Sequence, residues 1–334
     1  MNRKEFIGKG LAAGALLTPA ATIHASSSDK VDVQKISAPK EEEIFIEREV
    51  KGRPHEGKVL AAIQPHCDDI AFYAAGTVAK LINEGYTGYM IRTSNDDAAG
   101  RGATTGERVY NNEIGTNSTA KALGLKKVYD LGYRNHRMDE YNIQEIKGRL
   151  IFLFRMLKVD TIICYDPYGA YEENPDHYIT ARAVEAASWM AGMGSDYSEQ
   201  VEAVGRHGVS EKYYFARGPQ IVNRVVETTS YIDKKVEANT ANIYQGPGIS
   251  GAAWRQSLAE QGKKLPILGD SDESANESYI KNFMMDMDSM AIRGVPSDKE
   301  IGKQYGLEWA ERFHYIGPNP SIREDYIKEN AVKK

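Results

Sequence analysis

Two short polar segments of the sequence combine histidine with carboxylates at the point where an apolar run has just ended. The run 59–64 is followed by Pro65-His66-Cys67-Asp68-Asp69, and the run 161–165 leads into a loop that closes with Asn174-Pro175-Asp176-His177. Two imidazoles and one carboxylate that converge from different segments suit a divalent metal with an open coordination position. The pattern therefore indicates a catalytic metal site, with Zn²⁺ as the first candidate and another divalent metal as the alternative.

The first segment contains one carboxylate more than a metal site with three protein ligands requires. Asp68 and Asp69 are adjacent, so their side chains diverge, and one can stay unligated when the other binds the metal. An unligated Asp68 can serve as a general base, because a metal lowers the pKa of bound water toward about 7 and the base takes the remaining proton. Taken alone, each segment is equally compatible with a helix start in which an aspartate caps free backbone amides.

From Lys58 onward, apolar runs of strand length alternate with segments of helical period. This alternation is typical of βαβ units, and it predicts a Rossmann-like α/β fold with a mostly parallel sheet flanked by helices. The predicted strands cover 59–64, 86–93, 127–131, 161–165 and 213–216, and the predicted helices cover 70–84, 107–123, 143–157, 177–190, 232–243, 277–290 and 298–313. Ligands bind at the carboxyl ends of the strands in such sheets, which is where both polar segments lie.

In order and spacing, the two segments resemble those of the PIG-L/LmbE-like zinc-dependent N-acetylglucosaminyl deacetylases. The motifs of that family read His-Pro-Asp-Asp-Glu after the first strand and His-Pro-Asp-His further along, and the resemblance extends over about residues 58–245. By position it implies the metal ligands His66, Asp69 and His177, with Asp68 as the general base.

The chain departs from the family pattern in both motifs and in a later segment. Cys67 and Ile70 stand where the family has Pro and Glu, and neither change removes a ligand. Asn174 replaces the first His of His-Pro-Asp-His, which the family uses to stabilise the oxyanion and which the aspartate at Asp176 orients. An amide can donate a hydrogen bond to an oxyanion but cannot supply a proton. Asn242 again replaces a His, in a segment that reads Ala-His-x-Ser-Gln in the family, so the chain is expected to be a divergent member.

Four further residues are candidates for substrate binding. His136 follows the third predicted strand, and Arg101 lies in the Gly-rich loop 94–106. Tyr168 and Tyr171 precede the second polar segment and could stack on the apolar face of a sugar. A histidine on a surface loop and a solvated arginine are the alternatives, because loops are exposed by default.

The amino terminus has the order of an export signal. Arg3, Lys4 and Lys9 precede a short Gly/Ala/Leu stretch, after which Ile23-His24-Ala25 approximates a small-residue cleavage site. The Arg3-Lys4 pair resembles a twin-arginine signal in which Lys replaces the second Arg, so the Sec and twin-arginine routes both stay open. A disordered tail is the alternative to a signal. The expected location of the mature protein is therefore periplasmic or extracellular.

The domain organisation follows from these features. We expect residues 1–25 to be the export signal, 26–43 a polar linker, 44–245 the catalytic domain, and 246–334 a Gly/Ser-rich excursion with helices that pack on that domain.

Composition argues against nucleic acid as a partner and against a membrane span. The 334 residues carry a formal net charge of −5 and are 41% hydrophobic, as is ordinary for a globular protein. The sequence has no basic stripe of the kind that binds nucleic acid, and no apolar run of about 18 residues that could span a membrane after signal removal. Cys67 and Cys164 are too few for a disulfide framework or a Cys-rich zinc site; two buried thiols are favoured over one disulfide.

The sequence therefore predicts an exported metal-dependent hydrolase that removes an acetyl group from an N-acetylated sugar or glycoconjugate. One alternative is a metal-dependent amidase or esterase that acts on another small molecule. A catalytically weak carbohydrate-binding protein is a second alternative, although binding alone would not need Asp68. A dinucleotide-dependent dehydrogenase is disfavoured, because the turn 65–70 lacks the three glycines of a pyrophosphate cradle.

Overall fold

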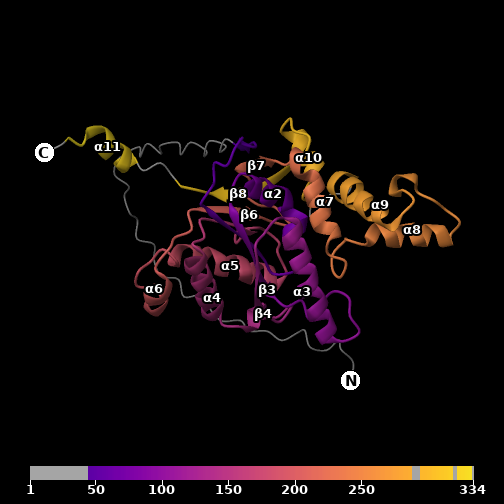
Figure 1. Ribbon diagram of the computed structural model, residues 1–334, viewed down its shortest axis with the longest axis horizontal. Helices are drawn as coiled ribbons and strands as arrows, with labels where there is room; N and C mark the ends of the chain where they lie inside the picture. The colour runs from indigo at the N-terminus through magenta and orange to yellow at the C-terminus, as the bar shows by residue number, and fades with distance from the viewer. Residues whose placement is uncertain (1–43, 288–293, 319–321, 333–334) are drawn as a thin grey trace, which may run out of the picture. The chain divides into compact units, whose positions relative to one another are not determined.

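The computed structural model describes residues 44–287, 294–318 and 322–332, so the predicted export signal and linker lie outside the described residues. The described part is built around an eight-stranded sheet in the order β1-β7-β8-β6-β5-β2-β3-β4 (Figure 1). The strands are β1 (Phe45–Glu47), β2 (Val59–Gln64), β3 (Thr87–Ser94), β4 (Val128–Tyr133), β5 (Thr161–Tyr165), β6 (Glu211–Phe215), β7 (Arg224–Glu227) and β8 (Ala310–Ile316). All neighbouring strands pair in parallel except β8, which is antiparallel to both β6 and β7. The predicted α/β fold with a mostly parallel sheet is therefore confirmed.

Helices flank the sheet in two groups, which Figure 1 shows on its two sides. One group contains α4 packed on α5, and the other contains α7 packed on α2 and α3. The helices are α1 (Asp69–Tyr73), α2 (Ala75–Asn83), α3 (Thr105–Ala122), α4 (Ile143–Leu157), α5 (Pro175–Met190), α6 (Ser198–Val204), α7 (Ile232–Thr240), α8 (Ser250–Glu260), α9 (Asp272–Ser278), α10 (Asp298–Gln304) and α11 (Ile322–Asn330). A π-helix, η4 (Tyr279–Met287), continues α9, and short 3₁₀ turns lie at η1 (Met138–Glu140), η2 (Thr229–Tyr231) and η3 (Pro266–Leu268). Within the described ranges, none of the helices has the length and apolar character needed to cross a membrane.

The central strands are buried on both faces, as helices on both sides of a parallel sheet require. Every residue of β5 is buried, and so are all residues of β2 except its first. These two strands pair directly, with Leu60 opposite Thr161. Because parallel neighbours end at the same edge, the polar segments that follow β2 and β5 come together there.

The carboxyl-terminal part differs from the prediction. The predicted helix over 298–313 is wrong beyond Gln304: the chain turns at Gly306, which has a φ of +71°, and residues 310–316 form β8. The turn is closed by the amides of Gly306 and Leu307, which donate to the carbonyls of Lys303 and Gly302, a pairing that ends many helices. The strand then forms because β6 and β7 offer it backbone partners on both sides.

A buried ionic cluster fastens β8 and α10 to the rest of the domain. Glu311, in β8, accepts hydrogen bonds from the amides of Gly76 (3.0 Å) and Thr77 (2.8 Å) in the first turn of α2. The Nζ atom of Lys235, in α7, lies 2.8 Å from Glu311 and 2.6 Å from Asp298 at the start of α10. Lys235 and Glu311 are almost fully buried, so each charge depends on its partners for compensation.

This cluster predicts a large stability loss for Lys235→Met. The variant leaves Asp298 and Glu311 without their shared cation, which should lower the free energy of unfolding by about 3–5 kcal/mol. The measurement is urea unfolding of both proteins. Lys234→Met is the matched control, because Lys234 lies on the same helix in an exposed pair with Glu237 and should change stability by less than about 0.5 kcal/mol.

The pH dependence gives a second check on the same pair of proteins. Burial raises the pKa of Asp298 to about 6 even with Lys235 present. Without Lys235 the pKa of Asp298 rises further, so this carboxyl takes up its proton at a higher pH in Lys235→Met than in wild type. The stability difference between the two proteins should therefore narrow as the pH falls toward about 6 and level off below it. A difference that stays constant, or a loss no greater than that of Lys234→Met, would contradict the assignment.

Candidate metal and catalytic site

Three predicted ligands converge at the carboxyl edge of the sheet. His66 lies between β2 and α1, Asp69 is the first residue of α1, and His177 lies in the first turn of α5. The Nδ1 atom of His66 is 3.0 Å from the Nε2 atom of His177 and 3.4 Å from Oδ2 of Asp69. The remaining pair, His177 Nε2 and Asp69 Oδ1, is 3.6 Å apart. All three side chains are buried.

These spacings fit a divalent metal. A tetrahedral zinc with ligand bonds of about 2.0–2.1 Å places its ligand atoms about 3.3 Å from one another, close to the three separations in the site. The donor set, two imidazoles and one carboxylate, is the set that catalytic zinc uses when one position stays open for water or substrate. His66, Asp69 and His177 therefore form a group that can bind a metal ion.

Neighbouring side chains fix the orientation of the three ligands. The Nε2 atom of His66 lies 3.1 Å from Oδ2 of Asp176, and Asp69 accepts hydrogen bonds from the Tyr165 hydroxyl (2.7 Å) and from the His66 amide (2.8 Å). The Tyr165 ring also stacks on His177, with centroids 4.1 Å apart. Glu172 Oε2 lies 3.1 Å from His177 Nδ1, at an angle that does not make a hydrogen bond. Such outer contacts hold metal ligands in their binding geometry.

Asp176 has a different partner from the one that the family resemblance implies. Its fully buried carboxylate accepts from the amides of His136 (2.6 Å) and Met138 (3.2 Å), in addition to contacting the His66 ring. The side chain of Asn174 instead accepts a hydrogen bond from the Asp176 amide at 3.0 Å and so caps the start of α5. The carboxylate at 176 thus orients His66 and the loop after β4, rather than the side chain at 174.

Asp68 faces a cavity of about 200 Å³ together with the three ligands. Its carboxylate does not cap α1 and makes no hydrogen bond with another residue of the described chain. The backbone of Gly246, with a φ of +79°, packs against it: a Cβ atom there would lie 3.0 Å from the Asp68 Oδ2 atom. The cavity is lined by His66, Asp68, Asp69, Phe72, Tyr73, Ala99, Asn135, His136, Tyr165, Asn174, His177, Arg217 and Gln245.

The two adjacent aspartates have opposite pKa shifts. Burial raises the pKa of Asp68 to about 7, and the charge on Asp69 acts in the same direction. Burial acts on Asp69 too, but the His177 and His66 rings outweigh it and hold the pKa of Asp69 at about 2. The pKa of His66 is well above its ordinary value, because its bonds to Asp176 and Asp69 outweigh the effect of burial. Opposite shifts in neighbouring carboxyls are the arrangement that separates a ligand from a base.

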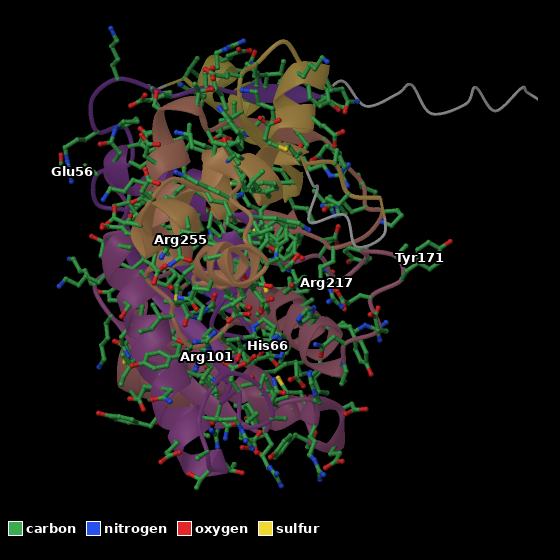
Figure 2. The ribbon with its side chains drawn as sticks, turned by 90° about the vertical axis from the view of Figure 1, so that its right-hand side faces the viewer. Glu56, His66, Arg101, Tyr171, Arg217 and Arg255 are labelled. Atoms are coloured by element: carbon green, nitrogen blue, oxygen red, sulfur yellow. The ribbon has the colours of Figure 1, made fainter. Side chains whose placement is uncertain are left out.

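The predicted substrate-binding residues lie in two places. His136 lines the cavity. Arg101 is exposed and bonds through its amide to the carbonyl of Tyr244, outside the cavity lining. Tyr168 and Tyr171 are 58% and 76% exposed and do not line the cavity either. Tyr168 donates a hydrogen bond to Glu185, and Figure 2 shows Tyr171 projecting away from His66.

Two residues that line the cavity, Arg217 and Asn135, belong to no motif of the sequence. Arg217, just beyond β6, bonds through Nε to Oε2 of Glu172 at 3.0 Å. Asn135 is buried, and neither its amide oxygen nor its amide nitrogen has a hydrogen-bond partner in the described part of the chain. Buried amides without partners are rare in folded proteins, so Asn135 is available to a ligand in the cavity. Its position beside His136, after a strand of the parallel sheet, was the one available clue.

Asn242, the second asparagine that stands where the family has histidine, lies against Cys67. Cys67 and Cys164 are both buried free thiols, as favoured from the sequence. The Asn242 amide donates to the Cys67 sulfur at 3.2 Å, while its oxygen accepts from the amides of Tyr244 and Gln245. Asn242 therefore shapes the turn behind the site.

Residues 61–188 match the model of the GlcNAc-PI de-N-acetylase (PIG-L) family. The chain is 22% identical over 205 residues to the diacetylchitobiose deacetylase of Thermococcus kodakarensis, in an alignment that covers 60% of this chain and 75% of that protein.

Two solved structures share the fold. The N,N'-diacetylchitobiose deacetylase of Pyrococcus horikoshii has a TM-score of 0.58 at 18% identity, covering 78% of this chain and 84% of its own. GalB, the 4-carboxy-2-hydroxymuconate hydratase of Pseudomonas putida, has a TM-score of 0.55 at 14% identity, covering 79% of this chain and 98% of its own. Because the two catalyse different reactions, the fold alone does not decide the chemistry.

The ligand geometry predicts that the protein binds about one divalent metal ion and loses it when His66, Asp69 or His177 is replaced by Ala, because two remaining ligands hold a metal weakly. Elemental analysis of the purified proteins measures this. His207→Ala is the control, since His207 is a partly exposed histidine paired with Asp160 away from the site. Stoichiometric metal in His177→Ala would rule out the assignment.

Proposed function

The chain belongs to the PIG-L/LmbE-like deacetylase family, and on that premise we propose that it is an exported metal-dependent N-deacetylase that acts on an N-acetylated sugar or glycoconjugate. The observation that carries the proposal is the juxtaposition of the buried His66–Asp69–His177 group with a free Asp68 carboxylate in one cavity. A protein that only binds carbohydrate has no need of a carboxylate kept free beside a metal group.

The reaction is the hydrolysis of an amide to acetate and an amine. A divalent metal held by His66, Asp69 and His177 would supply Lewis acidity toward the carbonyl and lower the pKa of water. Asp68 accepts the proton of the attacking water as the new C–O bond forms. The same carboxyl group then returns the proton to the nitrogen as the C–N bond breaks. His136, in the same cavity, is the second candidate for that proton donor.

Asn174 is placed to assist through its amide nitrogen. Its oxygen is used as the cap of α5, whereas Nδ2 makes no hydrogen bond with any residue in the described ranges, and the side chain lines the cavity. A hydrogen bond from Nδ2 to the carbonyl oxygen would strengthen as negative charge develops there.

Hydrolysis of a different amide or ester remains the second candidate function. It is favoured by Asn174, which stands where the family places an imidazole, because an altered donor next to the carbonyl changes which substrates react well.

The export part of the proposal rests on the amino terminus, where cationic residues are followed by an apolar stretch within residues 1–25. Comparing the mature amino terminus after secretion with the full chain tests that part of the proposal.

The first test is acetate release from a panel of neutral and charged N-acetylated sugars by the metal-loaded protein. Asp68→Asn should keep its metal and lose turnover by about 10²–10⁴-fold, because the amide preserves the shape but cannot accept a proton. Asp270→Asn, at an exposed carboxylate, is the matched control. No acetate from any sugar would refute the proposed reaction, and near wild-type turnover in metal-replete Asp68→Asn would refute the base.

The Asn174 side chain predicts separable effects on stability and turnover. Asn174→Ala removes the cap and the donor, so it should cost about 1 kcal/mol of stability and lower turnover by about 10–10³-fold. Asn174→Ser keeps a capping oxygen without the amide donor, so its stability should stay near wild type while turnover still falls. Asn174→His should be tolerated or faster. Melting temperature and turnover are measured on each preparation. If Asn174→Ala loses stability but keeps its turnover, Asn174 is only a helix cap and not an oxyanion donor.

A further inference from the structure

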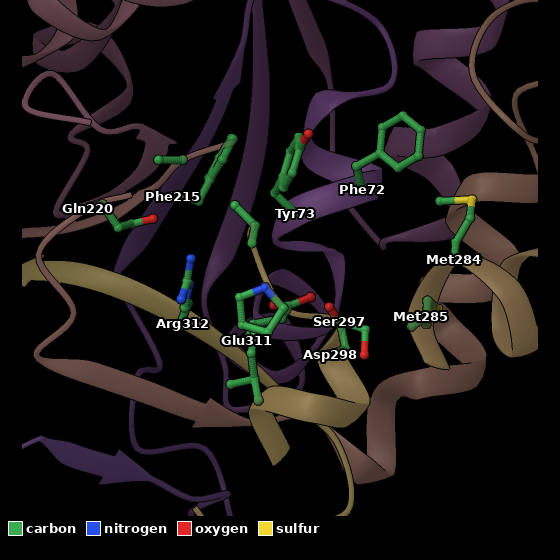
Figure 3. Close-up of a pocket in the computed structure, with 14 residues that line it drawn as sticks. Phe72, Tyr73, Phe215, Gln220, Met284, Met285, Ser297, Asp298, Glu311 and Arg312 are labelled. Carbon is green, nitrogen blue, oxygen red and sulfur yellow. The ribbon is translucent and has the colours of Figure 1, made fainter. Parts of the chain in front are cut away.

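A second, smaller cavity adjoins the catalytic cavity. It measures about 40 Å³ and lies between α1, the end of β6, α10 and β8 (Figure 3). Phe72 and Tyr73 line both cavities, so the small cavity and the catalytic cavity share a wall at these two residues. Phe215 stacks on Tyr73, with ring centroids 5.4 Å apart, and continues the aromatic wall. The small cavity thus neighbours the catalytic cavity and has an aromatic wall on the side of α1 and β6.

Arg312 of β8 presents an uncompensated cation to this cavity. Its guanidinium forms no ion pair or hydrogen bond with any residue in the described ranges, and its Nε atom is buried. A guanidinium remains protonated at neutral pH, although burial lowers the pKa of Arg312. Arg312 is partly buried, and an arginine whose charge is partly removed from water is usually paired with an acidic group in native proteins.

The two carboxylates that line the small cavity with Arg312 are bonded to other partners. Asp298 and Glu311 also line the cavity, but both bond to Lys235, and Glu311 in addition accepts from two amides of α2. Figure 3 shows Arg312 and Asp298 on opposite sides of the cavity. The Arg312 charge is therefore left for a group that enters from outside the protein.

The size of the cavity limits what that group can be. A volume of about 40 Å³ exceeds the roughly 10–15 Å³ that one water needs, so a carboxylate or part of a phosphate can be accommodated. Arginine is the side chain best suited to bind either group, because its planar fork pairs with two oxygens at once.

We propose that the Arg312 cavity is a subsite for an anionic substituent, carboxylate or phosphate, of the sugar whose N-acetyl group lies in the catalytic cavity. This proposal rests on the proposed function, and it adds the class of substrate: an acidic or phosphorylated N-acetylated sugar. Phe72 and Tyr73 would then contact the part of the sugar that connects the two cavities.

The test compares three probes in the non-hydrolysing Asp68→Asn background by calorimetry. The probes are N-acetylglucosamine, N-acetylmuramic acid and N-acetylglucosamine 6-phosphate, which are neutral, carboxylated and phosphorylated. We expect at least one anionic probe to bind about 10–100-fold more tightly than the neutral sugar, as a charge-assisted contact provides. Arg312→Gln should remove that preference and leave the affinity for N-acetylglucosamine unchanged.

Two further variants keep the comparison decisive. Arg312→Lys retains a cation and should keep part of the preference even if Arg312→Gln folds poorly. Arg255→Gln is the control, because Arg255 of α8 is paired with Asp272 and lines neither cavity. The subsite proposal would be overturned if the Asp68→Asn protein with an intact Arg312 bound all three probes equally. It would also be overturned if the preference for an anionic probe survived Arg312→Gln.

The proposed function and the subsite can fail separately. Acetate release from the neutral sugar without any anion preference would refute the subsite and keep the deacetylase. Anion binding that depends on Arg312, with no acetate released by the wild-type protein from any probe, would keep the subsite and refute the deacetylase.

Discussion

The carboxylate of Asp176 connects the three loops from which the catalytic cavity is built. It lies at the start of α5, after β5; its Oδ2 atom contacts the His66 ring, after β2, and both oxygens accept backbone amides from residues 136 and 138, after β4. One buried group therefore sets the orientation of His66, a predicted metal ligand, and the path of the loop that carries Asn135 and His136. Removing it would release several donors at once, whereas the loss of a ligand such as His177 leaves the loops in place.

The carboxyl-terminal strand extends this arrangement rather than adding a separate layer. β8 enters the sheet between β6 and β7, and its His314 ring lies 3.2 Å from the carboxylate of Asp166, at the start of the loop between β5 and α5. Glu311 fastens the same strand to α2, and Arg312 faces the small cavity. Residues far beyond the family match at 61–188 thus support the loop that leads to His177 and line the small cavity beside the candidate site.

The sequence predicted the parts whose determinants are local. β2 and α4 have their predicted bounds, because an apolar run and an amphipathic period are each closed by polar or turn-forming neighbours. The ligands His66 and His177 could be found because they follow strands that pair in parallel. β8 could not, since its strand state depends on partners about 90 residues away, such as Asn223 beside Tyr315. The same reason hid Arg217 and Asn135, whose roles come from a cavity formed by several loops and not from a motif.

The two positions where the family has histidine and this chain has asparagine share one structural consequence. Asn174 and Asn242 each use the side-chain oxygen to accept a backbone amide two residues on, a local turn that asparagine forms readily. Each amide nitrogen is left for another contact: Asn242 donates to the Cys67 sulfur, and Asn174 faces the cavity. An imidazole can donate a proton as well as a hydrogen bond, but an amide can only hydrogen-bond. Under the proposed mechanism, proton transfer in this cavity rests on Asp68, with His136 as the second candidate, and substrate recognition rests on neutral amides and on the arginines at the margin of the cavity.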